Sequence, residues 1–232
     1  MFQDKGNPNR VVLSFRGTEL NGDTIRDLLL TDLRIGFDGY ASPQAVPLYR
    51  YIKQLMTPAG QPVSYTEADM VKLYSLQRGE LYNPSTPEDE VYLASFKLGF
   101  EPGVGVDAGQ PAGTAVLGPG REIDIAGHSL GGHLALLAQR LFPGTFDDVV
   151  TVNAVTFYST FAVQYSPAYF GSENVLSQFG QWTPGNILRI ESEGDAVSGL
   201  GSVHPGLTYT VGMETQPVSG TLDNHSAANI AD

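Results

Sequence analysis

Short apolar runs alternate along this chain with stretches that have helical spacing. Apolar, β-branched or alternating runs predict five strands, at 10–15, 121–126, 148–157, 187–191 and 207–211. Apolar residues at helical spacing predict five helices, at 24–33, 47–56, 66–77, 89–98 and 133–142. The Gly- and Pro-rich segment 99–120 predicts a long loop or a ribbon.

Strands that alternate with helices are typical of an α/β protein with a mainly parallel central sheet and helices on both faces. At 232 residues, the chain is short enough for one hydrophobic core, so we predict a single domain over 1–232. In such sheets the ligand chemistry lies at the carboxyl ends of the strands.

Composition narrows the classes of function. A formal net charge of −12 with 13 Lys plus Arg excludes the basic surface that nucleic acids require, so no nucleic-acid partner is expected. The same acidity means that any contact with a lipid surface would come from apolar groups. The chain has no cysteine, which excludes disulfides, thiolate metal sites and a cysteine nucleophile. No signal peptide and no membrane-spanning segment is visible, so a soluble protein is expected.

The sequence GHSLGG at 127–132 fits the pattern G-x-S-x-G between a predicted strand and a predicted helix. A serine on so sharp a turn is held in a strained backbone, and the flanking glycines let strand and helix approach closely. Ser129 is therefore the candidate nucleophile. The amide of Leu130, at the helix N-terminus, is a candidate oxyanion donor. A glycine-rich turn with an incidental serine is the simpler interpretation of the same letters.

A serine nucleophile needs a base, and the chain has four histidines. His128 lies inside the turn, and His133 falls one helical turn later, where a packing role is expected. His204 and His225 both follow the serine, as the order Ser, acid, His requires. We favour His225, which lies in a polar loop after the last predicted strand, and keep His204 as the second candidate.

The base needs a carboxylate to orient it. Asp195 follows the predicted strand at 187–191 and is the candidate; a simple turn Asp is the plainer interpretation. Asp223 is a rival acid, more typical of a local backbone contact. The second oxyanion donor is expected on the loop after the first strand, where Thr18 follows Gly17.

Taken together, FRGT at 15–18, GHSLGG, the pair Gly194-Asp195 and a late histidine resemble the class 3, fungal-lipase-like family of α/β-hydrolases. The resemblance implies an α/β-hydrolase fold with Ser129, Asp195 and His225 as the triad. It also implies an oxyanion hole formed by Thr18 and Leu130. The lack of disulfides is closer to bacterial relatives, so a secreted, extracellular bacterial protein is expected.

Family members carry a short amphipathic lid after the oxyanion strand, and the segment 20–33 matches that place. By its composition alone, the stretch 24–33 could equally be an ordinary core-facing helix. An apolar lid would allow an acidic protein to hold a micelle or membrane surface.

These observations predict a serine carboxylic-ester hydrolase for lipid acyl esters, either a triacylglycerol lipase or a phospholipase A1, working through an acyl-enzyme. One alternative is an esterase for soluble aryl or short-chain esters, like the feruloyl esterases. A second is a catalytically silent binding module, and an amidase or peptidase is a third. No cofactor or metal is required by this chemistry, although calcium could help an acidic protein approach phospholipid headgroups.

Overall fold

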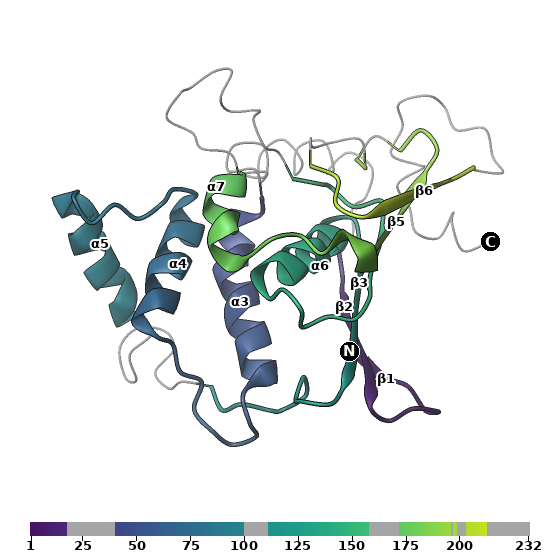
Figure 1. Ribbon diagram of the computed structural model, residues 1–232, viewed down its shortest axis with the longest axis horizontal. Coiled ribbons are helices and arrows are strands. Elements are labelled where there is room, and N and C mark those ends of the chain that lie inside the picture. Colours follow the sequence, from purple (N-terminus) through teal and green to yellow (C-terminus); the bar gives the residue numbers. More distant parts are fainter. Residues whose placement is uncertain (18–39, 100–110, 158–171, 196, 199–202, 213–232) are drawn as a thin grey trace.

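The computed structural model describes residues 1–17, 40–99, 111–157, 172–195, 197–198 and 203–212 (Figure 1). In this part of the chain the strands form one six-stranded sheet in the order β1-β2-β3-β4-β5-β6. Strand β1 pairs antiparallel with β2, and every later pair is parallel. The strands are β1 (Phe2–Gln3), β2 (Arg10–Phe15), β3 (Glu122–His128), β4 (Val149–Val152), β5 (Ile187–Ser192) and β6 (Leu207–Val211). The predicted α/β class with a mainly parallel sheet is confirmed.

Buried apolar residues in register hold one face of the sheet together. Leu13 pairs with Ile125, Ile125 with Val149, and Val149 with Ile187, and all four side chains are buried. Each strand contributes alternate residues to this face, because side chains point to opposite sides of a strand. The row therefore continues across four strands and forms the floor on which the helices pack.

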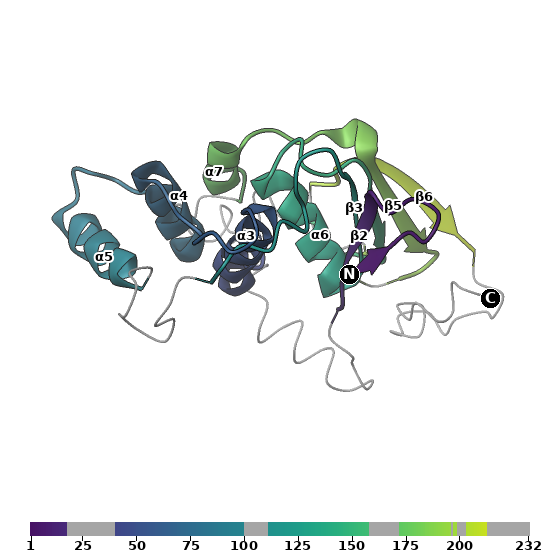
Figure 2. The same ribbon diagram turned by 90° about the horizontal axis from the view of Figure 1, so that it is seen from below.

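The helices form successive layers beside this face (Figures 1 and 2). Helix α6 lies against β2, β3 and β4, α3 packs between α6 and α4, and α5 contacts α4 at the periphery. The helices are α3 (Ser42–Met56), α4 (Glu67–Arg78), α5 (Pro87–Leu98), α6 (Leu130–Leu141) and α7 (Ser172–Leu176), with 3-10 turns η1 (Ser177–Phe179) and η2 (Pro184–Asn186).

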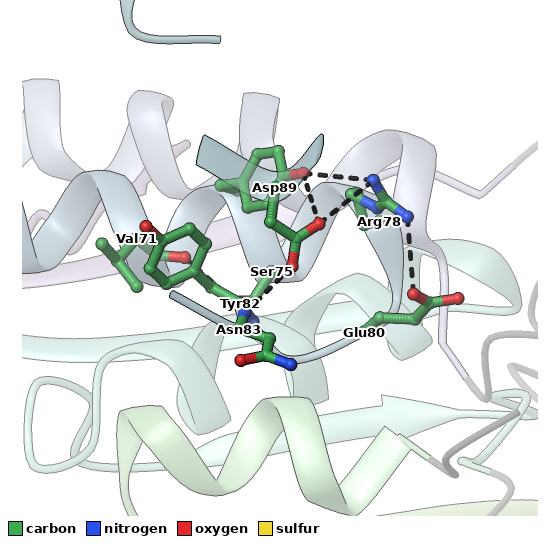
Figure 3. A network of polar contacts seen from close by, with 8 residues as sticks. Val71, Ser75, Arg78, Glu80, Tyr82, Asn83 and Asp89 are labelled. Carbon is green, nitrogen blue, oxygen red and sulfur yellow. Dashed lines mark hydrogen bonds and ion pairs between the residues drawn. The ribbon is translucent and has the colours of Figure 1, made fainter. Parts of the chain in front are cut away.

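A polar network joins α4 to α5 (Figure 3). Asp89, in the first turn of α5, accepts a hydrogen bond from the Asn83 amide at 3.0 Å and pairs with Arg78 at 3.5 Å. The Tyr82 amide donates to Ser75 Oγ at 2.9 Å. These contacts fix the turn between the two helices, since they satisfy backbone groups that the turn leaves outside regular structure.

The opposite face of the sheet has a different covering. A groove on that face is lined by strand residues and by η2, with no residue from an α-helix of the described ranges. Its strand residues include Val12, Ala126, Val150 and Ile190, which are only partly buried. Within the described part of the chain, the α-helices therefore cover one face of the sheet. No α-helix of the described residues lines the groove on the other face.

Several elements differ from the sequence prediction. Helix α6 begins at Leu130 instead of 133, and strand β3 ends at His128 instead of 126. Helix α3 begins at Ser42, one turn before the predicted start at 47, and Pro47 lies inside the helix. Pro43 lies in the first turn of the helix, where proline is favoured because its missing N–H would have no intrahelical acceptor. Strand β1 was not predicted, because two exposed residues carry no pattern. Strand β4 stops at Val152, since Asn153 takes a positive φ of 47° that no strand continues. The predicted helix and lid at 20–33 fall outside the described residues.

Candidate active site

The turn between β3 and α6 holds Ser129 in a strained conformation. Its φ of 57° and ψ of −127° lie in a region that residues with a side chain rarely adopt. Its amide donates to the carbonyl of Val152 at 3.0 Å, and its side chain is only 5% exposed. This is the strand, sharp turn and helix context that the G-x-S-x-G pattern requires.

Glycines permit the close approach of three backbone segments at this turn. A Cβ on Gly127 would lie 2.2 Å from Gly131 O, so strand β3 and helix α6 touch directly. A Cβ on Gly131 would lie 2.2 Å from the carbonyl of Phe15, at the end of β2. Gly17 is equally confined, because its Cβ would meet His128 O at 2.6 Å and Ser129 Cβ at 3.2 Å. The backbone that follows β2 therefore lies in direct contact with the serine turn, and only glycine at position 17 permits this contact.

The two candidate oxyanion donors flank this contact. Leu130 is the first residue of α6, and the first helical hydrogen bond runs from His133 N to Ser129 O at 3.1 Å. The Leu130 amide thus lies in the first turn, where helix amides have no intrahelical acceptor and the helix dipole favours an anion. Thr18 itself lies outside the described residues, although its neighbour Gly17 is placed beside Ser129.

Asp195 lies beyond the carboxyl end of β5, on a turn that begins at Ser192. Its amide donates to Ser192 O at 3.1 Å, and Gly194 takes a φ of 75° within the turn. Its carboxylate accepts the amides of Val197 at 3.3 Å and Ser198 at 2.7 Å, and the residue is 9% exposed. Two backbone donors stabilise the ionised form of a buried carboxyl group, which suits a residue that must stay charged beside a base.

Ser129 and Asp195 are brought to the same edge of the sheet. β3 and β5 are separated by β4 alone, and all three run parallel. Neighbouring strands are about 4.8 Å apart, so the two strand ends are separated by roughly 10 Å. The two residues therefore follow strand ends that lie two strand positions apart on one edge of the sheet.

The candidate bases differ in what the structure describes. His225 and the rival acid Asp223 fall outside the described residues. His204 is described: its ring is exposed and its Nδ1 lies 3.3 Å from Thr156 Oγ1. Among the hydrogen bonds between described residues, that of the His204 ring goes to Thr156 and none joins it to Asp195 or Ser129.

His133 has the packing role expected of it. Its Nε2 accepts the amide of Ala41 at 3.1 Å, so Nδ1 carries the proton and donates to Val155 O at 3.0 Å. Burial lowers the pKa of His133 to about 4, and the bond to Val155 opposes that shift. Its ring also packs against Phe157, with centroids 4.5 Å apart. The neutral His133 ring, with both nitrogens hydrogen-bonded, links the start of α3 to α6 beside the serine turn.

The sequence did not single out Asn153, which also lies at this edge of the sheet. It follows the end of β4, is fully buried and adopts a left-handed backbone conformation. Its side chain bonds to Ser192, at the start of the turn that carries Asp195. An Asn directly after an apolar run was the available signal, because Asn is enriched among residues with positive φ.

Two further observations bear on metal and membrane. The described residues contain no group of three or more His, Asp or Glu side chains that could hold a metal ion. None of their helices is long and apolar enough to cross a membrane.

Comparisons with known proteins find similarity among solved structures. No protein-family model matches the chain, and no curated protein matches it. Among solved structures, the Lip2 lipase from Yarrowia lipolytica is similar over 95% of this chain, with 19% sequence identity and a TM-score of 0.32. The match covers 66% of the lipase, so this chain spans just under two thirds of that protein's length.

Proposed function

We propose that this chain is a serine hydrolase of carboxylic esters, with lipid acyl esters as its substrates. Ser129 is the nucleophile, His225 the base and Asp195 the acid that orients it, while the amides of Leu130 and Thr18 bind the oxyanion. The observation that carries the proposal is the backbone of Ser129, with φ 57° and ψ −127° at the start of α6. Such strain persists where function depends on it.

The reaction follows from this arrangement. The Ser129 hydroxyl adds to the acyl carbonyl as its proton passes to His225, and the carbonyl oxygen becomes an anion held by the two amides. The tetrahedral intermediate collapses, and the alcohol leaves with the proton that His225 returns. Water, deprotonated by His225, then adds to the acyl-enzyme, and the second tetrahedral intermediate collapses: the bond to Ser129 Oγ breaks, His225 returns the proton to that oxygen, and the acid is released. The carboxylate of Asp195 holds the imidazole in the tautomer that accepts the serine proton.

Two features of the described residues, and the order of the candidate residues along the chain, support the proposal. Gly17 and Gly131 keep the end of β2 within contact distance of the serine turn, so a donor that follows Gly17 would be close to Leu130. The Asp195 carboxylate is held by two amides at the same edge of the sheet. The Ser-Asp-His order along the chain is that of the α/β-hydrolases.

The choice of lipid esters rests on the resemblance to class 3 lipases and on the amphipathic segment 20–33. With a formal net charge of −12, the chain needs apolar groups to hold a lipid surface. A leucine-rich segment next to the oxyanion strand would supply them.

The first experiment labels the nucleophile. A fluorophosphonate probe should add to wild-type protein once, and intact mass analysis should find no adduct on Ser129→Ala. Ser14→Ala is the matched control, because Ser14 is an exposed serine on the neighbouring strand β2. It should be labelled like wild type. A folded wild-type protein that takes no label would refute the hydrolase and favour a silent binding module.

The second experiment assigns the base and the substrate class. Hydrolysis of a p-nitrophenyl acyl series and of phospholipid is measured for His225→Ala and His204→Ala. His225→Ala should lose activity by about three orders of magnitude or more, and His204→Ala should keep it. Full activity in His225→Ala would remove His225 from the triad.

The same substrates test the substrate class. A hydrolysis rate that rises sharply above the micellar threshold supports lipid esters, whereas a rate that does not change at that threshold supports soluble esters. Equal rates with and without chelator would exclude a calcium requirement.

A further inference from the structure

We infer that Asn153 is a positioning residue for the catalytic acid: it ties the turn that carries Asp195 to the strand that supports Ser129. The inference rests on the proposed function. Asn153 directly follows β4, the strand between the serine strand and the acid strand. No element predicted from the sequence required a polar side chain at this point.

The side chain of Asn153 bonds to the amide and to the hydroxyl of one residue on β5. Its Oδ1 accepts the amide of Ser192 at 2.8 Å, and its Nδ2 donates to Ser192 Oγ at 3.0 Å. Its own amide donates to Ile190 O at 2.9 Å. Asn153 and Ser192 are both buried, so each of these bonds is shielded from water.

These bonds link the two halves of the site. On one side, the residue before Asn153 is Val152, whose carbonyl accepts the amide of Ser129 at 3.0 Å. On the other, Ser192 O accepts the amide of Asp195 at 3.1 Å. Asn153 therefore follows the residue that binds the Ser129 amide, and it bonds directly to Ser192, where the turn that carries Asp195 begins.

The chemistry of this position explains the residue type. A carboxamide can donate to the Ser192 hydroxyl and accept from the Ser192 amide at the same time. Asn also tolerates a φ of 47° better than most residues with a side chain. A longer or apolar side chain would leave the buried Ser192 hydroxyl and amide without this partner. The turn at 192–195 would then lose the contact that sets its position relative to β4.

Loss of the Asn153 contacts should lower the rate of the chemical step and leave substrate binding unchanged. A displaced Asp195 would orient the imidazole poorly, and small misplacements of catalytic groups cost up to about 100-fold. Asn153 and Ser192 are buried and so are not exposed to a bound substrate, and substrate affinity should not depend on them.

The test uses Asn153→Gly, because glycine adopts the positive φ without strain while the change removes the whole side chain, the carboxamide included. We expect kcat for a p-nitrophenyl ester to fall by about 10- to 100-fold, with KM within about threefold of wild type. In the Asp195→Asn background, the same change should lower the residual kcat by less than about twofold, since residues that act as a unit are not additive. Asn153→Asp keeps the shape and the acceptor and should retain more of the rate than Asn153→Gly.

The matched control is Asn186→Ala. Asn186 donates to Phe146 O at 2.9 Å and lies at the opposite, amino end of β5. It should lower the melting temperature without lowering kcat. Should Asn153→Gly fail to fold, Ser192→Ala removes one of the two side-chain contacts and is measured instead.

The outcomes separate this role from the proposed function. An unchanged kcat in Asn153→Gly, or an equal loss with and without the Asp195 carboxylate, would overturn the positioning role and leave the hydrolase intact. A wild-type protein that neither hydrolyses esters nor takes the fluorophosphonate label would overturn both.

Discussion

The strained backbone of Ser129 makes a thermodynamic prediction that does not depend on finding a substrate. A residue with a side chain at φ 57° and ψ −127° carries about 1–3 kcal/mol of strain, which glycine would not carry. Ser129→Ala removes the hydroxyl and keeps the strain, whereas Ser129→Gly removes both. The step from Ala to Gly at this position therefore releases the strain, while it costs one buried methyl group and adds freedom to the unfolded chain.

Ala135→Gly calibrates those two costs. Ala135 is fully buried in α6, the helix that Ser129 precedes, and has helical backbone angles. A buried methyl contributes about 0.8 kcal/mol, and glycine in a helix costs a further 0.5–1 kcal/mol or so. Ala135→Gly should therefore lower the free energy of unfolding by about 1.5 kcal/mol. The Ala-to-Gly step at 129 should be more favourable than the step at 135 by about 1–3 kcal/mol.

Urea denaturation at 25 °C measures the difference, with four proteins: wild type, Ser129→Ala, Ser129→Gly and Ala135→Gly. Thermal melting gives an independent reading, because 1 kcal/mol corresponds to about 2–4 °C in a chain of this size. Both Ser129 variants should be catalytically inactive. The free energy of unfolding of Ser129→Gly, relative to Ser129→Ala, should be higher than the cost measured at Ala135 predicts. Equal costs for the two Ala-to-Gly steps would refute the argument that strain is stored at the serine.

Three further predictions follow from the packing. Gly131→Ala would place a Cβ 2.2 Å from the carbonyl of Phe15 and should destabilise the protein by about 3 kcal/mol or more in urea, whereas Gly185→Ala, with open space around it, should be nearly neutral. Because burial lowers the pKa of His133 from 6.5 to about 4, the neutral ring stabilises the fold fully above pH 6.5 and loses that contribution as pH falls towards 4. Urea titrations should therefore show a pH slope steeper in wild type than in the non-titrating His133→Gln, by up to about 1.4 kcal/mol per pH unit, and equal slopes would contradict this. Thr66→Ala removes the hydrogen bond from the Asp69 amide to Thr66 Oγ1, one half of the capping box of α4, and should lower the free energy of unfolding by about 1 kcal/mol in thermal melts, while Thr86→Ala, whose side chain makes no cap bond to α5, should change it by less than about 0.5 kcal/mol.

The regular elements could be predicted because their signals are local. Apolar runs at 10–15 and 187–191 became β2 and β5 with little change of boundary, and the two-residue period of a strand needs no distant partner to be visible. The serine turn was equally readable, since its glycines reflect contacts between segments that flank Ser129 directly. The location of Asp195 could also be predicted, because a strand end delivers its next residues to one edge of a parallel sheet.

Features without a local pattern could not be predicted. Strand β1 exists because β2 offers it a pairing edge, and α3 begins before Pro47 because the preceding residues pack into the core. The location of all described helices on one face of the sheet is also a property of the assembled layers. His225 and Thr18 stay predictions, as both fall outside the described residues.

Sequence alone determined the parallel sheet, the strained serine turn and the order of Ser129 and Asp195, because each depends on residues that are neighbours in the chain. Only the tertiary structure decided how those two residues are held relative to one another. Asn153 lies 39 positions from Ser192 in sequence, yet it bonds to the amide and the hydroxyl of that residue in the fold. A long-range hydrogen bond leaves no periodicity in the sequence, since its partners meet only when β4 and β5 pair in register.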